Sequence, residues 1–70
     1  TTTDEIKEVL KELSWKNKLV LDVGCGTGLF AYGASKLGSK QVLGIDFSKN
    51  AIAIAKKTHK NHNLQYHYLL

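Results

Sequence analysis

The sequence contains no arginine, a single cysteine and no long apolar run, and each shortage excludes a class of protein. The net charge of +4 at pH 7 comes from ten lysines against six acids. Because nucleic-acid recognition favours the bidentate guanidinium group, scattered lysines indicate a solvated surface and leave nucleic-acid binding without support. One cysteine cannot form an internal disulfide, and no stretch approaches the roughly 20 apolar residues that span a bilayer. We expect a cytoplasmic protein with no membrane partner.

The length and composition predict one small folded unit. Seventy residues allow a single domain at most, and a chain of that size buries only about 60% of the surface that its unfolded form exposes. Apolar residues make up 43% of the chain and charged residues 23%, as in soluble globular proteins. We therefore expect one domain of marginal stability over residues 1–70.

Helical and strand patterns alternate along the chain. A capping pair, Thr2 and Glu5, precedes apolar residues at helical spacing. The run Leu19–Val23 is almost continuously apolar and predicts a strand that is buried on both faces of a parallel sheet. The expected elements are helix 4–14, strand 19–23, helix 28–37, strand 41–46, helix 49–60 and strand 64–69.

This order of elements predicts the fold class. Strands that alternate with helices of this length pair in parallel through right-handed crossovers. The order α-β-α-β-α-β therefore indicates an α/β fold, the first half of a doubly wound, Rossmann-like parallel sheet, and an incomplete one. Strand 19–23 would be an unpaired apolar edge, which can aggregate or pair with a partner strand. Gly33 costs its helix about 1 kcal/mol relative to Ala, a cost that close packing of the helix against the sheet would explain.

A glycine cluster follows the first strand, at Gly24, Gly26 and Gly28. Glycines between a strand and a helix let a ligand approach the backbone closely, because no side chain fills the space. A phosphate-binding loop of the Walker type would need Lys where Ala34 stands, and a dinucleotide fingerprint would need a third glycine where Leu29 stands. The cluster therefore excludes the first ligand class and matches the second only in part.

Two carboxylates narrow the choice of ligand. Asp22, just before the glycines, would repel a pyrophosphate but attract a cationic amine and a sulfonium, and even a screened pair at about 4 Å gains on the order of 1 to 4 kcal/mol. Asp46 ends the second strand, where an acid can accept hydrogen bonds from both ribose hydroxyls. Phe47 offers an apolar surface for an adenine ring. The charges favour S-adenosylmethionine.

Residues 20–28 (Val-Leu-Asp-Val-Gly-Cys-Gly-Thr-Gly) and 44–48 (Gly-Ile-Asp-Phe-Ser) resemble the first two motifs of class I S-adenosylmethionine-dependent methyltransferases. The similarity extends over about residues 18–57. It implies that the first motif holds the methionine portion of the cofactor and that the acid after the second strand holds the ribose. The cofactor-binding residues implied by this resemblance are Asp22, Gly24, Cys25, Gly26, Gly28, Asp46 and Phe47.

The resemblance also implies parts that seventy residues do not contain. Class I enzymes have a seven-stranded sheet in the order 3-2-1-4-5-7-6, with an adenine-contacting acid after the third strand and substrate residues after the fourth. No catalytic residue and no methyl acceptor can therefore be assigned. We expect the N-terminal cofactor-binding portion of a methyltransferase, inactive alone, whose partner is the remainder of the domain or a strand-pairing protein. Two alternatives stay open: a non-catalytic, methyltransferase-like interaction module, and an NAD-binding half-domain of an oxidoreductase.

Cysteine and histidine suggest other chemistry that the pattern does not support. Cys25 lies near a helix N-terminus, which lowers a thiol pKa, but no partner base is identifiable and a backbone contact is the expected role. His59, His62 and His67 lack a Cys or acid that would complete a ligand set, so the sequence predicts no metal site.

Overall fold

The computed structural model describes residues 3–70 and forms one sheet with helices beside it. In chain order the elements are α1 (Thr3–Glu12), β1 (Leu19–Val23), α2 (Leu29–Ser35), β2 (Gln41–Asp46), α3 (Lys49–Thr58) and β3 (Leu64–Tyr68). The strands lie in the order β1-β2-β3, and both pairs are parallel. The predicted α/β class, the alternation of elements and the edge position of β1 are confirmed.

The helices are shorter than predicted. They end at Glu12, Ser35 and Thr58, two residues before the predicted ends at 14, 37 and 60, and β3 ends one residue before 69. The backbone leaves the helical region before the predicted end of α3: His59, with φ of −123° and ψ of 75°, is already its C-cap. The predicted capping pair of the first helix includes Thr2, which lies outside the described residues.

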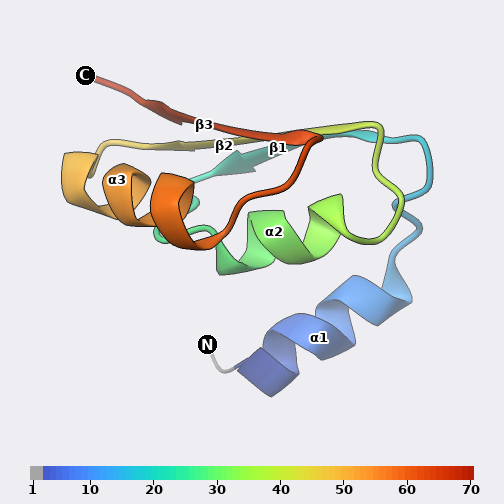
Figure 1. Cartoon of the computed structure of the whole chain (residues 1–70). Helices are drawn as coiled ribbons and strands as arrows, with labels where there is room; N and C mark the ends of the chain where they lie inside the picture. Colours follow the sequence, from blue (N-terminus) through green and yellow to red (C-terminus); the bar gives the residue numbers. More distant parts are fainter. Residues whose placement is uncertain (1–2) are drawn as a thin grey trace.

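All of the helices lie on one side of the sheet (Figure 1). Helices α2 and α3 pack directly against the strands, and α1 lies beneath α2. Val42 and Ala34 are fully buried between these layers. A Cβ at Gly33 would run into the Leu10 side chain of α1. The close approach that explains this glycine is therefore to α1, and not to the sheet as the sequence suggested.

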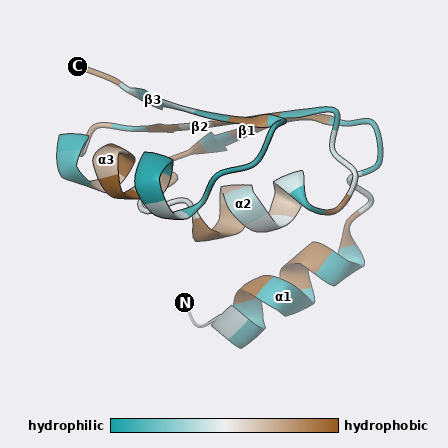
Figure 2. Ribbon diagram, viewed as in Figure 1, coloured by the Kyte–Doolittle hydropathy of each residue, from teal (hydrophilic) through white to brown (hydrophobic). Residues whose placement is uncertain are grey.

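The other face of the sheet carries no helix among residues 3–70. Leu19, Leu21 and Val23 alternate with the helix-facing positions of β1, and their side chains are 76%, 59% and 69% exposed. Figure 2 shows hydrophobic stretches in the strands above the helix layer. The predicted burial of β1 on both faces is wrong for this chain, because the described helices cover one face only.

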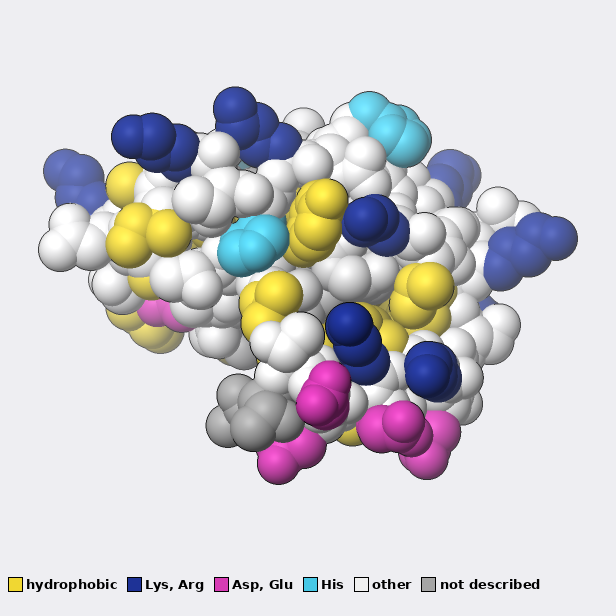
Figure 3. Space-filling view, turned by 60° about the horizontal axis from the view of Figure 1, so that its bottom comes forward, with side chains coloured by type: hydrophobic (Ala, Val, Ile, Leu, Met, Phe, Trp, Pro, Cys, Tyr) yellow, Lys and Arg dark blue, Asp and Glu magenta, His cyan; other side chains and the backbone are white. Residues whose placement is uncertain are grey.

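Charges of opposite sign are separated on the surface. Four of the six acids belong to α1: Asp4, Glu5, Glu8 and Glu12. Acidic side chains gather along one rim in Figure 3, while lysines are spread over the rest of that face. The other two acids, Asp22 and Asp46, lie at the carboxyl ends of β1 and β2. None of the helices described is long and apolar enough to cross a bilayer.

Candidate functional site: the glycine loop and its two carboxylates

We call residues 24–28, which join β1 to α2, the glycine loop. Gly24, Gly26 and Gly28 have φ angles of +73°, +58° and +90°, in the left-handed region that side chains disfavour. A Cβ at Gly24 or Gly26 would meet no atom within 4 Å, whereas a Cβ at Gly28 would overlap the side chain of Tyr66. The first half of the loop therefore has open space beside its backbone, and the second half is packed.

Hydrogen bonds fix the glycine loop to the carboxyl end of β2. The N–H groups of Gly24 and Cys25 both donate to the carbonyl oxygen of Ile45, at 2.8 and 2.9 Å. The Gly26 N–H donates to Oδ2 of Asp46 at 2.8 Å. These hydrogen bonds hold the backbone of the loop in a set position.

Asp46 joins the glycine loop to the start of α3. Its second oxygen, Oδ1, accepts from the N–H of Ser48 at 2.8 Å, and Ser48 caps α3 by accepting from the N–H of Ala51 at 3.2 Å. The N–H groups of Ser48 and Gly26 hold the pKa of Asp46 below its usual value. Asp46 is therefore ionised at neutral pH, and its oxygens keep lone pairs for further donors.

Asp22 has the opposite environment. Its Oδ2 atom is buried and has no hydrogen-bond partner among the described residues. Burial raises the pKa of Asp22 first, and the negative charge of Asp46 raises it further. A buried carboxylate oxygen without a donor is costly, so this atom marks a place that a cation or hydrogen-bond donor of a ligand would complete. The carboxylates of Asp22 and Asp46, together with the open space beside the loop, fit a cationic nucleoside.

Cys25 is buried behind the loop, with its side chain 9% exposed and packed against Gly44. Burial, followed by the charges of Asp22 and Asp46, raises the pKa of the Cys25 thiol. The pKa of the thiol is therefore shifted away from that of an activated nucleophile. No three His, Cys, Asp or Glu residues in the part of the chain that the structure describes are grouped to hold a metal ion.

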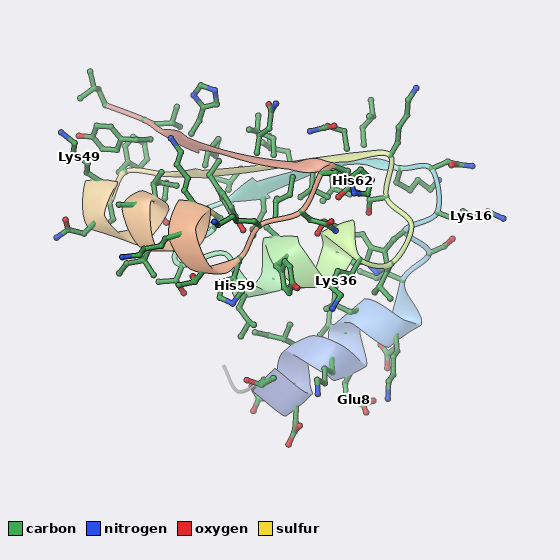
Figure 4. All side chains as sticks on the ribbon, in the orientation of Figure 1. Glu8, Lys16, Lys36, Lys49, His59 and His62 are labelled. Atoms are coloured by element: carbon green, nitrogen blue, oxygen red, sulfur yellow. The ribbon has the colours of Figure 1, made fainter. Side chains whose placement is uncertain are left out.

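The structure brings the predicted site residues together at the carboxyl edge of β1 and β2. Phe47 follows Asp46 directly, and its ring is 71% exposed. Two further residues reach the loop that sequence reasoning did not include: Tyr66 from β3, and His59 from the end of α3 (Figure 4). The sequence makes His59 a candidate only for a metal site, and no short motif connects either residue with the glycines.

Comparison with known proteins separates the ligand classes that the sequence left open. A model of the ribosomal protein L11 methyltransferase (PrmA) family matches residues 1–69. The chain belongs to this family. It is 38% identical over 69 residues to the ribosomal protein L11 methyltransferase of Hamiltonella defensa, a match that covers 99% of this chain and 23% of that protein. The protein of the same name from Deinococcus radiodurans is 43% identical over 63 residues, covering 90% of this chain and 23% of the relative.

Solved structures agree with this family assignment. A putative S-adenosylmethionine-dependent methyltransferase from Listeria monocytogenes superposes with a TM-score of 0.80 at 32% identity, covering 94% of this chain and 32% of that one. An S-adenosylmethionine-dependent methyltransferase from Mesorhizobium loti gives a TM-score of 0.82 at 25% identity, covering 97% and 33%. The predicted Rossmann-like methyltransferase fold is confirmed, and the oxidoreductase and interaction-module alternatives are not favoured. This member of the L11 methyltransferase family spans less than a quarter of the length of the two curated relatives.

Proposed function

We propose that this chain binds S-adenosylmethionine against the open half of the glycine loop, as the N-terminal cofactor-binding portion of a methyltransferase. The amine and sulfonium of the cofactor lie toward Asp22, the ribose hydroxyls donate to Asp46, and the adenine lies against Phe47. The proposed cofactor-binding residues are those of the sequence prediction: Asp22, Gly24, Cys25, Gly26, Gly28, Asp46 and Phe47.

The unpartnered Oδ2 atom of Asp22 carries this proposal. A pyrophosphate beside it would add negative charge to a site where Asp22 and Asp46 already repel each other. A cationic ligand would instead pair with the buried carboxylate and remove the cost of its burial. The space beside Gly24 and Gly26 allows such a ligand to contact the loop backbone.

The cofactor would supply a methyl group made electrophilic by the attached sulfonium. The residues of this chain would bind the cofactor, orient its methionine end through Asp22 and hold its ribose through Asp46. We propose ribosomal protein L11 as the methyl acceptor, because the family and the relatives named above are described by that substrate. A cytoplasmic location stays a prediction from composition.

Calorimetric titration of the protein with S-adenosylmethionine tests cofactor binding. We expect saturable binding that Asp22→Asn weakens and that Asp4→Asn, the same change on the acidic rim of α1, leaves unchanged. Absence of binding, or equal binding by both variants, would contradict the proposal.

Transfer of a radiolabelled methyl group from S-adenosylmethionine tests the acceptor separately. We expect label in purified ribosomal protein L11 when the full-length protein is present, and far less label with the Asp46→Ala variant at the same cofactor concentration. If L11 stayed unlabelled while another protein or RNA in the assay was labelled, L11 would not be the acceptor. The proposal that the chain binds S-adenosylmethionine would be unaffected.

A further inference from the structure

His59 reaches the packed half of the glycine loop from the end of α3. Its Nδ1 atom lies 2.8 Å from the carbonyl oxygen of Thr27. It also lies 3.3 Å from Oγ1 of Thr58, whose hydroxyl donates to the Ile54 carbonyl at 2.7 Å. A carbonyl oxygen only accepts, and the Thr58 hydroxyl has already used its proton. Both neighbours therefore require that Nδ1 of His59 carries a proton and donates it.

Tyr66 fixes the position of His59 and fills the space under the loop. Its hydroxyl donates to the His59 carbonyl oxygen at 2.7 Å, and its ring lies so close to Gly28 that a Cβ there would stand 2.8 Å from Cζ. The Tyr66 side chain is only 7% exposed, and burial raises its pKa to about 12, so the hydroxyl keeps its proton at neutral pH. The ring of Tyr32 in α2 lies against His59, with centroids 5.3 Å apart.

These contacts connect three elements to one end of the glycine loop. Asp46 holds the loop at Gly26, and His59 with Tyr66 holds it at Thr27 and Gly28. A loop that is already ordered before a ligand arrives loses less conformational entropy on binding. The second set of contacts lies at the end of the loop where a Cβ on Gly28 would meet Tyr66, whereas a Cβ on Gly24 or Gly26 would meet no atom within 4 Å.

We propose that His59 and Tyr66 are positioning residues for cofactor binding: through the Nδ1–H contact to Thr27 and the packing under Gly28, they preset the loop to receive the cofactor. The inference rests on the proposed binding of S-adenosylmethionine. Neither residue is a catalytic residue, since both act through the loop backbone.

The test measures loop order and cofactor affinity in the same variants. His59→Leu removes the Nδ1–H donor that contacts Thr27 and Thr58, and Tyr66→Phe removes the hydrogen bond to the His59 carbonyl oxygen. The net value of one such bond corresponds to a change of about twofold to tenfold. We expect the Gly28 amide, which donates to the Cys25 carbonyl at 3.0 Å, to exchange with solvent faster by that factor. We expect the affinity for S-adenosylmethionine, measured by calorimetry, to fall by a similar factor.

Two control variants separate positioning from general damage. His59→Asn places an amide N–H where Nδ1 stands, so it should restore both slow exchange and affinity. His62→Leu changes a histidine that is hydrogen-bonded to Asn61 and that lies on the connection before β3 (Figure 4). It should change neither measurement.

If exchange of the Gly28 amide were unchanged in both His59→Leu and Tyr66→Phe, the positioning role would be overturned, whatever the affinity for S-adenosylmethionine. Faster exchange with unchanged affinity would overturn the link between loop order and binding. Absence of S-adenosylmethionine binding in the wild type would instead overturn the proposed function, while the exchange measurement would still decide whether His59 orders the loop.

Discussion

Asp22 and Asp46 end neighbouring strands of one sheet, yet the fold treats their carboxylates in opposite ways. Both oxygens of Asp46 accept backbone hydrogen bonds, from Gly26 and Ser48, and the pKa of Asp46 is lowered. The Oδ2 atom of Asp22 is buried without a donor, and the pKa of Asp22 is raised. The fold itself uses the first charge and leaves the second without a partner.

The difference gives the two acids different roles at one site: Asp46 stabilises the folded loop, and Asp22 is available to bind a ligand. Asp46 stabilises the loop before any ligand arrives, and it keeps lone pairs that a ribose can use. Asp22 costs the folded state free energy whenever it is ionised, because a buried charge without a partner is poorly solvated. A cationic ligand would pair with the Asp22 carboxylate and relieve that cost, which would favour binding. The two residues should therefore respond differently to substitution, pH and ligand.

The largest effect is expected from Asp46→Ala. This change removes the carboxylate that accepts from the Gly26 and Ser48 N–H groups, and it also removes the proposed ribose contacts. Both the stability of the protein and its affinity for the cofactor should therefore fall. Because hydrogen bonds to a charged acceptor are stronger than neutral ones, we expect the affinity to fall about a hundredfold. Thermal unfolding and calorimetric titration with S-adenosylmethionine would measure the two losses. A variant that retains wild-type affinity would remove Asp46 from the site.

A smaller effect with a different signature is expected from Asp22→Asn. The affinity for S-adenosylmethionine should fall about tenfold, since one charge pair is lost. The melting temperature should stay level or rise, because the folded state no longer buries an unpaired charge. Loss of stability equal to that of Asp46→Ala would contradict the proposed contrast between the two acids.

The pH dependence of stability should show the two acids with opposite signs. Above the ordinary value of 3.8, the unfolded chain ionises Asp22 before the folded protein does, so rising pH should cost stability until the raised pKa of Asp22 is passed. The contribution of Asp46 is present above that ordinary value and is lost as pH falls through its lowered pKa.

Chemical denaturation from pH 3 to pH 7 would resolve these contributions. The loss of stability on raising the pH should disappear in Asp22→Asn. The loss of stability that Asp46 causes as the pH falls should disappear in Asp46→Ala. Cofactor affinity should rise with pH across the window in which Asp22 ionises. A pH-independent affinity in the wild type would show that the Asp22 charge does not bind the ligand.

The smallest effect is expected from Phe47→Ala, next to Asp46. The ring is 71% exposed, so its removal should change the unfolding free energy by less than about 0.5 kcal/mol. Affinity should fall only a few-fold, from loss of the proposed adenine contact. The matched control is Tyr68→Ala on β3, another partly exposed aromatic residue, which should leave affinity unchanged.

Local patterns in the sequence predicted the fold and the position of the loop. The alternating apolar segments set the order of strands and helices, and Gly24, Gly26 and Gly28 marked the turn at the end of β1. Asp22 and Asp46 could be placed at neighbouring strand ends, because parallel strands bring their carboxyl ends to one edge. Their opposite environments could not be predicted, since they depend on which backbone N–H groups face each carboxylate.

Contacts between distant residues account for what the sequence did not show. His59 lies 32 positions from Thr27 in the chain, and only the return of α3 toward the loop brings them together. The exposure of Leu21 was mispredicted because an apolar run does not reveal how many layers cover a strand. The burial of Cys25 against Gly44, which raises the pKa of its thiol, could likewise not be predicted from its position near a helix N-terminus.

The central claim, that Asp22 selects a cationic nucleoside over a diphosphate, is tested most directly by titrating the protein with S-adenosylmethionine and with NADH under identical conditions. The account predicts tighter binding of S-adenosylmethionine, by at least about tenfold, and a reduced preference in Asp22→Asn. Tighter binding of NADH to the wild type would contradict it.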